Sequence, residues 1–369
     1  RGAGGLDGVR EQAVLTPAQE SLLRDPMRPI VLVTKRPDAT LSEAIAPGLN
    51  EIGVFLPYSP LHHLLLDACG APLVATSANV SGEPVLTDSR EVEARLAPVA
   101  GAFLHHDRPI ARPADDPVFR VIAGAARPLR LGRGVAPLEI DLPFRLPQPL
   151  LAVGGHMKNT IALAWDTRAV VSPHIGDLDA PRSLAVFEQV IADLQALYGV
   201  HAARLVHDAH PGYASTRWAK RAGLPAAAVF HHHAHAAALA GEFPQIERWL
   251  VFTWDGVGYG ADGTLWGGEA LLGYPGQWRR VASMRSFRLP GGERAGREPW
   301  RSALALCWEA GIEWKACPLD APLLREAWER GLNAPRSSAV GRLFDAAAAL
   351  TGLNLHSSFE GQGPMQLES

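Results

Sequence analysis

The arrangement of a strand, a glycine-rich turn and a second strand occurs twice in this chain, and it limits the possible folds more than any other feature. In the first copy, apolar runs at 150–153 and 159–165 flank a Gly-Gly pair. The second copy covers 249–273 and contains a glycine-rich turn at 255–263. The repetition predicts an α/β fold with an internal duplication, with two unrelated hairpins in a generic α/β fold as the alternative.

A proline-rich segment separates the duplicated part from what precedes it. Three prolines within seven residues, without hydrophobic periodicity, predict a linker over 141–149. We therefore expect one α/β domain at 1–140 and a second at 150–369. In the first domain, apolar runs predict buried strands and a short helix, namely strands at 30–33, 52–56 and 72–76 and a helix at 61–69.

Between the two copies of the duplicated pattern, an amphipathic helix is predicted at 181–198. Its apolar residues recur at spacings of three and four, at positions Phe187, Val190, Ile191, Leu194, Leu197 and Tyr198. Strands are predicted at 203–206 and 226–230, and the second of these leads directly into a histidine-rich segment.

Composition excludes several classes of protein. The chain is 47% apolar with a net charge of −3, so no electrostatic signal indicates a nucleic-acid partner. No apolar run has the length of a membrane span, and no signal peptide opens the chain. Cys69, Cys307 and Cys317 are odd in number and lack C-x-x-C spacing. We therefore expect a cytoplasmic protein without disulfides or a cysteine zinc site.

The segment Phe230-His231-His232-His233-Ala234-His235 contains four histidines in five positions. The alanines that follow favour a helix, on which His231 and His235 would lie one turn apart on the same face. Two imidazoles in this arrangement can form half of a transition-metal site. A histidine cluster without metal is an equally good interpretation from spacing alone.

The second glycine-rich turn is a candidate phosphate and metal site. Gly256 and Gly258 would let backbone amides approach phosphate oxygens, and Asp255 at the strand end could hold a metal ion. A second place where the backbone could approach a ligand closely is Gly267-Gly268, followed by the carboxylate of Glu269. An ordinary hairpin is the alternative, because Asp-Gly pairs favour tight turns.

The first domain carries a polar loop at 76–84 and a group of arginines. The side chains of Thr76, Ser77, Asn79 and Ser81 could bind phosphate or carbonyl groups, although a capped surface loop is the simpler interpretation. Arginines suit bidentate contacts to phosphate, and a solvated basic face is the alternative; the candidates are Arg108, Arg112, Arg127, Arg130 and Arg133.

Taken together, these segments resemble the HypF family of hydrogenase-maturation carbamoyltransferases, from about residue 29 to residue 368. The resemblance rests on the order of many motifs: the loop 76–84 and the stretch 106–116 of a YrdC-like domain, then Gly154-Gly155-His156-Met157-Lys158-Asn159-Thr160, His174-Ile175-Gly176-Asp177-Leu178, His207-Asp208-Ala209-His210-Pro211, residues 231–235 and 255–269, Arg297-Glu298-Pro299-Trp300, Gly341-Arg342-Leu343-Phe344-Asp345 and Phe359-Glu360-Gly361-Gln362.

The resemblance implies a YrdC-like α/β domain followed by a duplicated α/β domain of the actin/hexokinase (ASKHA-like) type, incomplete at its C-terminus. It implies a reaction in two steps, with Mg and ATP. Carbamoyl-adenylate is formed from ATP and a unit derived from carbamoyl phosphate. The carbamoyl group then passes to the C-terminal cysteine of a HypE-type protein, where it becomes cyanide for the NiFe hydrogenase centre.

The same resemblance implies roles for individual residues. His231, His235 and Asp255 would hold zinc or iron(II), with a further carboxylate supplied near the C-terminus of longer relatives. Lys158 would be catalytic and Asn159 would contact the nucleotide, or either would be a turn residue. The nucleotide would also be bound by Thr76, Ser77, Asn79, Ser81, Arg112, Arg130, Arg133, Gly256, Gly258, Gly267, Gly268, Glu269, Gly341 and Asp345. For Asp345, ribose binding competes with a helix cap or a surface position.

The chain also departs from the family pattern. The acylphosphatase-like and zinc-finger modules are missing, and the glycine-rich start at 1–6 leads almost directly to residue 15 without the expected Lys/Arg-rich stretch. We therefore expect a fragment. Two other functions remain open: O-carbamoylation of a small molecule, and a non-catalytic remnant that binds nucleotide. A threonylcarbamoyl role in tRNA modification is disfavoured because its two domains usually lie on separate chains.

Overall fold

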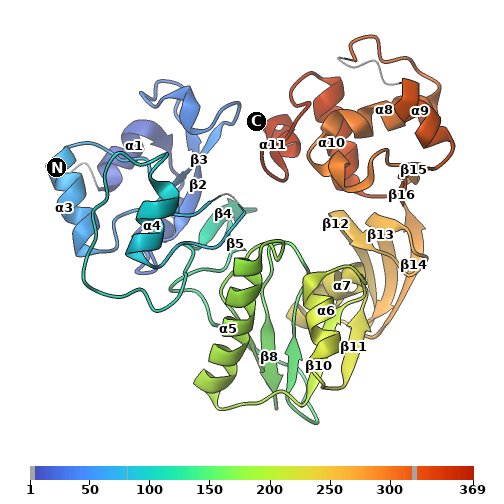
Figure 1. Ribbon diagram of the computed structural model, residues 1–369, viewed down its shortest axis with the longest axis horizontal. Helices are drawn as coiled ribbons and strands as arrows, with labels where there is room; N and C mark the ends of the chain where they lie inside the picture. The colour runs from blue at the N-terminus through green and yellow to red at the C-terminus, as the bar shows by residue number, and fades with distance from the viewer. Residues whose placement is uncertain (1–4, 81, 318–321) are drawn as a thin grey trace. The chain divides into compact units, whose positions relative to one another are not determined.

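The computed structural model describes residues 5–80, 82–317 and 322–369, which belong to two compact units (Figure 1). Unit 1 consists of Arg1–His207 and Gly212–Ala227, and unit 2 of Asp208–Pro211 and Ala228–Ser369. The division therefore falls between the two copies of the duplicated pattern. The domain limits expected from the sequence, 1–140 and 150–369 with a linker at 141–149, stay a prediction.

The N-terminal part of unit 1 is built around a five-stranded sheet in which β2 pairs with three other strands, antiparallel with β1 and β3 and parallel with β4. Buried residues of β2, including Val31 and Val33, form its core with Leu23 and Phe119. The elements are α1 (Leu6–Gln12), β1 (Ala13–Val14), α2 (Pro17–Arg24), β2 (Ile30–Lys35), η1 (Glu43–Ile45), β3 (Glu51–Val54), α3 (Pro60–Cys69), α4 (Ser89–Leu96), β4 (Val118–Ile122) and β5 (Ala125–Arg130).

Local sequence explains where two of these helices begin. Thr16 and Gln19 form a reciprocal capping box at the start of α2, with proline at the first helical position. Ser59 caps α3, and Gly70 ends that helix in the left-handed conformation. The predicted helix at 61–69 and the strands near 30 and 52 are therefore confirmed.

The predicted buried strand at 72–76 is wrong. These residues form neither helix nor strand and are exposed, with Leu73 at 49% and Val74 at 78% of their full accessibility. A short apolar run becomes a strand only when a neighbouring strand accepts its backbone hydrogen bonds. This run has no such partner in the sheet of β1 to β5.

The C-terminal part of unit 1 is a six-stranded sheet in the order β11-β10-β7-β8-β9-β6. Strands β7, β8 and β9 form an antiparallel meander, and β10 adds to β7 in parallel. The elements are β6 (Leu138–Asp141), β7 (Leu150–Ala152), β8 (Ala162–Trp165), β9 (Arg168–Val171), α5 (Pro181–Tyr198), β10 (Arg204–Asp208), α6 (Ala214–Arg221) and β11 (Ala226–Val229).

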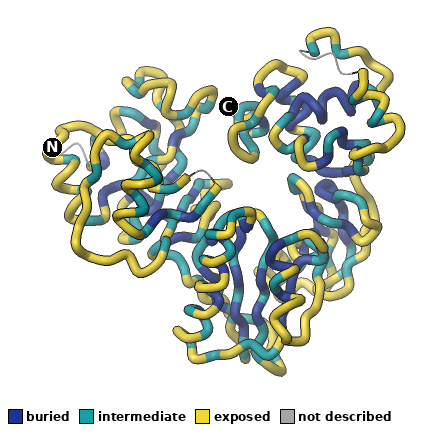
Figure 2. The backbone as a smooth tube through the Cα atoms, in the orientation of Figure 1, coloured by how far each residue is buried: buried dark blue, intermediate teal, exposed yellow. Residues whose placement is uncertain are grey.

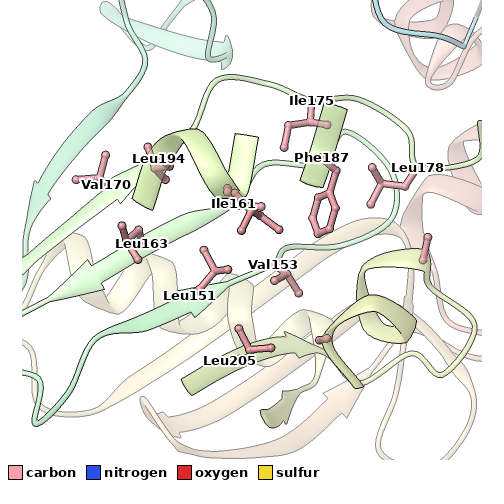
Figure 3. Close-up of a cluster of buried hydrophobic side chains, with 13 residues drawn as sticks. Leu151, Val153, Ile161, Leu163, Val170, Ile175, Leu178, Phe187, Leu194 and Leu205 are labelled. Carbon is pink, nitrogen blue, oxygen red and sulfur yellow. The ribbon is translucent and has the colours of Figure 1, made fainter. Parts of the chain in front are cut away.

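Helix α5 has the predicted bounds, and its apolar face covers this sheet. Phe187, fully buried, points into the core cluster that also contains Ile161 and Leu205 (Figure 3). The helix has proline at its first position and ends at Gly199 in the left-handed conformation. The proline-rich segment 142–149 contains no helix or strand, but the amides of Leu142 and Leu146 donate to the turn between β8 and β9.

Unit 2 repeats the antiparallel meander with longer strands. Strand β13 pairs with β12 and β14, and β15 and β16 extend the sheet. The predicted internal duplication is thus confirmed. The elements are α7 (His231–Glu242), β12 (Trp249–Tyr259), β13 (Leu265–Tyr274), β14 (Gln277–Ser283), β15 (Phe287–Arg288), η2 (Gly292–Gly296), α8 (Pro299–Ala310), α9 (Pro322–Glu329), β16 (Arg336–Ser337), α10 (Val340–Leu350) and α11 (Gln362–Glu368).

Helices α8 and α10 form the most buried helical layer of unit 2 (Figure 2). Ala303 of α8 packs against Ala346 and Ala349 of α10, and all three are essentially inaccessible. Small side chains let the two helix backbones approach closely. This packing fixes the start of α10 beside β12, where Gly341 lies against Gly256. Among the residues that the structure describes, no helix combines the length and apolar character needed to cross a membrane.

Candidate metal and nucleotide site

His231, His235 and Asp255 converge in unit 2. One potential ligand atom from each residue lies within 4.8 Å of the other two. The two histidines come from the first turns of α7, and the carboxylate comes from β12, which packs against that helix. The sequence-based grouping of these three residues therefore corresponds to a real cluster in space.

The helical spacing explains how α7 presents its histidines. His232, Ala236 and Ala240 follow one another at intervals of four and form the buried face of the helix against β12 and β13. His231 and His235 each precede a member of this buried face by one position. They therefore line its edge and remain partly accessible, as metal ligands with an open coordination position must be.

The position of Asp255 differs from the prediction. It does not end a strand: β12 continues to Tyr259, and Asp255 lies where the register between β12 and β13 shifts, between Trp254 and Gly258. A bulge of this kind turns a side chain away from its regular direction. The expected turn at 255–263 is correspondingly shorter, with Gly260 and Thr264 closing the hairpin by a backbone hydrogen bond.

The two oxygens of Asp255 have different surroundings. Oδ1 accepts the amide hydrogen of Gly256 at 2.6 Å. Oδ2 is buried, has no hydrogen-bond partner, and lies 3.3 Å from Nε2 of His231. A buried carboxylate oxygen is costly unless a cation compensates it, and either the protonated ring of His231 or a metal ion can do so. Two nitrogens and one carboxylate oxygen suit zinc or iron(II), so these residues fit a divalent metal.

Asp208, at the end of β10, orients His231. Its Oδ2 accepts from Nδ1 of His231 at 2.8 Å. With Nδ1 donating to a carboxylate, the lone pair of Nε2 is available to a metal, the arrangement that metal-bound histidines usually show. In the sequence, Asp208 is conspicuous only as part of the motif His207-Asp208-Ala209-His210-Pro211. Its place at the carboxyl end of a strand was the available signal for a functional role.

The carboxylates also control protonation of the cluster. Burial opposes the charge of His231, but Asp208 and Asp255 outweigh it and raise the pKa of His231 to about 9. Burial, assisted by the positive charge of His231, lowers the pKa of His235. Burial also lowers the pKa of His232 to about 4, so that its ring is neutral. A metal would replace the proton on Nε2 of His231, as metal binding to histidine generally does.

Three of the four glycines near Asp255 leave space for neighbouring atoms, and phosphate binding by all four stays a prediction. Gly256, Gly258, Gly267 and Gly268 do not adopt positive φ. At three of these positions a side chain would not fit, which explains the glycine. A Cβ at Gly258 would lie 2.5 Å from Cε1 of His232, and one at Gly267 or Gly268 would come within 2.7 Å of neighbouring atoms. Gly256 has room, with its nearest neighbour at 3.8 Å.

Glu269 is fully buried in β13 and already has partners. Its Oε1 accepts from the amides of Gly267 and Gly268 and from the hydroxyl of Ser338, while Arg280 lies 3.4 Å from Oε2. These contacts tie β13 to the segment that precedes α10. Nucleotide binding by Glu269 stays a prediction, and its contacts describe a structural role.

Gly341 and Asp345 lie on α10. A Cβ at Gly341 would come 2.8 Å from Cα of Gly256, so the glycine is required for this approach. Asp345 is buried, not a helix cap or a surface residue, and its Oδ2 lies 3.0 Å from Arg342. Burial raises the pKa of Asp345 to about 6 despite Arg342, and Glu360 adds to the increase. Ribose binding by Asp345 stays a prediction.

Lys158 and Asn159 lie in unit 1, after the first Gly-Gly pair. Lys158 is exposed and has φ of +48°, with its amide donating to Asp177 at 2.8 Å. Asn159 is buried, and its amide group donates to the carbonyls of Val153 and Gly155. Asn159 thus holds the turn in place. Strand β8 begins only at Ala162, later than predicted.

The polar loop of the N-terminal region is held by Asn79, whose amide group donates to the carbonyls of Val80 and Glu83. Thr76 and Ser77 are exposed, and the hydroxyl of Ser77 donates to the side-chain oxygen of Asn79. Ser81 lies outside the described residues. The structure therefore makes Asn79 the organiser of the loop, while ligand binding by the hydroxyls stays a prediction.

The arginines have separate roles in the fold. Arg133 pairs with Asp116 at 2.6 Å, donates to two carbonyls of the segment after α2, and covers the ring of Tyr58. Arg112 pairs with Asp193 of α5 at 3.2 Å. Arg130 lies on the exposed strand β5. Phosphate binding by these arginines stays a prediction, and the contacts of Arg133 are structural.

Comparison with known families divides the chain into three matches. Residues 6–132 match the Sua5/YciO/YrdC family, described as "Telomere recombination". Residues 145–242 match the "HypF Kae1-like domain". Residues 251–369 match "Carbamoyltransferase, Kae1-like Domain, second subdomain". The YrdC-like and actin-like parts expected from the sequence are therefore confirmed.

Individual relatives match almost the whole chain. Carbamoyltransferase HypF of Synechocystis sp. is 41% identical over 99% of this chain and 51% of its own length. The HypF of Rhodobacter capsulatus is 43% identical over 96% of this chain and 49% of its own length. The chain thus spans about half the length of these curated relatives.

Solved structures agree with the sequence matches. A crystal structure of full-length HypF in a phosphate- and nucleotide-bound form has a TM-score of 0.94 at 37% identity and covers 99% of this chain and 59% of its own. The HypF of T. kodakarensis has a TM-score of 0.92 at 31% identity over 99% of this chain and 50% of its own. The chain belongs to the HypF carbamoyltransferase family, with a Sua5/YrdC region followed by the two parts of a Kae1-like region.

Proposed function

We propose that this protein acts in hydrogenase maturation as a carbamoyltransferase, passing a carbamoyl group to the C-terminal cysteine of a HypE-type partner. The observation that carries the proposal is the cluster of His231, His235 and Asp255, with Asp208 orienting His231, in a chain of the HypF family. The chain spans about half the length of its curated relatives. We therefore propose that its residues contribute to the carbamoyl transfer of the whole protein. Cys69, Cys307 and Cys317 form no disulfide with one another, which suits the cytoplasm.

The proposed reaction has two balanced steps. Carbamate, which forms when water hydrolyses carbamoyl phosphate and phosphate leaves, attacks the α-phosphorus of ATP through a carboxylate oxygen, with Mg, and pyrophosphate leaves to give carbamoyl-adenylate. The cysteine thiolate of the partner then attacks the carbonyl carbon, the carbon–oxygen bond to the phosphate breaks, and AMP leaves. Adenylation is useful because AMP is a far better leaving group than hydroxide.

His231, His235 and Asp255 would hold the metal, zinc or iron(II), which acts as a Lewis acid toward oxygens of the intermediate. Asp208 keeps the imidazole of His231 in the required tautomer, and the bulge in β12 directs the carboxylate of Asp255 toward the two histidines. Lys158, on a strained turn of unit 1, is the proposed partner for a phosphate or carbonyl oxygen.

Carbamoyl transfer can be tested with purified protein, ATP, Mg²⁺, carbamoyl phosphate and an acceptor protein that ends in cysteine. We expect mass spectrometry to find one added carbamoyl group on the terminal cysteine. His235→Ala should abolish the transfer, while His233→Ala, a change on the same helix outside the cluster, should retain it. Transfer to an acceptor without the cysteine, or undiminished transfer by His235→Ala, would contradict the proposal.

Separate measurement of the first step makes the result more specific. Exchange of labelled pyrophosphate into ATP reports adenylation without the acceptor. We expect His235→Ala to retain this exchange, because the YrdC-like region is a distinct sheet with its own core. Loss of both steps would show that the variant acts on the whole fold.

A further inference from the structure

His232 is the one histidine of the 231–235 segment whose burial the proposed function leaves unexplained. Its side chain is completely inaccessible, and both ring nitrogens lack a hydrogen-bond partner. A buried polar group without partners destabilises the fold, so an apolar side chain would be expected at this position unless the ring has a function.

The surroundings of His232 show which group the ring faces. Its Nε2 lies 3.6 Å from Oδ2 of Asp255, the carboxylate oxygen without a hydrogen-bond donor. This separation is just beyond hydrogen-bond distance. The other titratable groups that act on the ring are Asp208 and the two histidines His231 and His235, whose ring centres lie 5.6 and 6.0 Å away. Oδ2 of Asp255 is thus a candidate acceptor for the Nε2 hydrogen.

Neighbouring residues hold the ring in this place. Gly258 leaves the space that the ring fills, since a Cβ there would lie 2.5 Å from Cε1 and 2.9 Å from Nδ1 of His232. Trp266 packs on another side, with ring centres 6.1 Å apart. His232 also begins the buried face that continues with Ala236 and Ala240. A ring fixed on these sides has little freedom to turn away from Asp255.

We propose that His232 is a positioning residue for the metal site, whose Nε2–H restrains Oδ2 of Asp255 and so sets the affinity for the ion. This inference rests on the proposed metal site and deepens it. His232 is not itself a proposed metal ligand. Among the residues that the structure describes, the potential metal ligands are His231, His235 and Asp255. Residues that orient metal ligands typically change metal affinity 10- to 100-fold when they are replaced.

The test is titration of the purified, metal-free chain with Co²⁺, followed by visible absorption, which reports coordination without any enzymatic activity. The variants are His232→Leu, which removes the donor, and His232→Gln, whose amide nitrogen can occupy the place of Nε2. His232→Asn places its nitrogen near Nδ1 instead. His233→Leu is the matched control, because His233 is the next residue of the helix and packs on Phe230 and Trp266.

We expect His232→Leu and His232→Asn to weaken Co²⁺ binding about 10- to 100-fold, with His232→Gln and His233→Leu close to the wild type. Thermal unfolding of each metal-free variant verifies the fold. The inference is overturned if His232→Leu binds like the wild type, or if the Gln and Asn variants are equally weak. Absence of binding by the wild type would overturn both the metal site and this inference, whereas binding unaffected by His232→Leu would overturn the inference alone.

Discussion

The replacement Gly258→Ala tests whether the glycines of β12 exist to make room for the histidines. The new Cβ would lie 2.5 Å from Cε1 of His232 and 2.9 Å from Cβ of His231, far closer than van der Waals contact. Overpacking of this kind costs about 1–3 kcal/mol. Alanine loses less backbone freedom than glycine on folding, and this difference stabilises the strand by about 0.5–1 kcal/mol. The central values of these two terms, about 2 and about 0.75 kcal/mol, leave a net loss of about 1 kcal/mol.

Gly256→Ala is the matched control, two residues away in the same bulge. Its Cβ would meet nothing closer than 3.8 Å, and Gly256 does not have positive φ. Thermal unfolding followed by circular dichroism should show Tm lowered by about 2–8 °C for Gly258→Ala, with Gly256→Ala at or slightly above the wild type because it loses flexibility without a clash. Gly258→Ala should also weaken Co²⁺ binding, because His231 must move. Equal Tm and equal metal binding for the two variants would refute the steric explanation.

Three further changes test other parts of the account. Asp208→Ala should weaken zinc or Co²⁺ binding about 10- to 100-fold in a competition titration, since His231 loses its orienting acceptor; unchanged affinity would remove Asp208 from the site. Asp345 has a pKa raised from 3.8 to about 6 in the folded protein, so its contribution to stability is present at low pH and is lost as pH rises through 6. Denaturation between pH 4 and 8 should therefore show the wild type losing about 2.5 kcal/mol relative to Asp345→Asn, and a constant difference would contradict the burial argument. Phe187→Ala should cost about 3–5 kcal/mol in urea unfolding, whereas Leu197→Ala, at a position 66% exposed on the same helix, should cost far less; similar losses would show that the α5 interface is misassigned.

The sequence predicted the parts of the fold that depend on local periodicity and termination signals. The bounds of α5 follow from its apolar spacing, from Pro181 and from Gly199. The grouping of His231 with His235 follows from the helical repeat. The strand at 72–76 failed because strand formation depends on a partner elsewhere in the chain, which an apolar run does not reveal.

The details of the site depended on pairing between distant segments. The bulge at Asp255 is a property of the register between β12 and β13, so the sequence of β12 alone could not locate it. The close contacts of Gly258 with α7 likewise join two elements. Asp208 precedes His231 by 23 residues and becomes its partner only through the end of β10. Local patterns therefore predicted the candidate ligands but not the residues that orient them.

The central claim is that His231, His235 and Asp255 hold a divalent metal. Elemental analysis of the purified chain and of a His231→Ala/His235→Ala variant tests this claim most directly. We predict about one zinc or iron per chain in the wild type and none in the variant, with both proteins folded by circular dichroism. A wild type without metal after incubation with zinc or iron(II), or a variant that retains the full amount, would contradict the account.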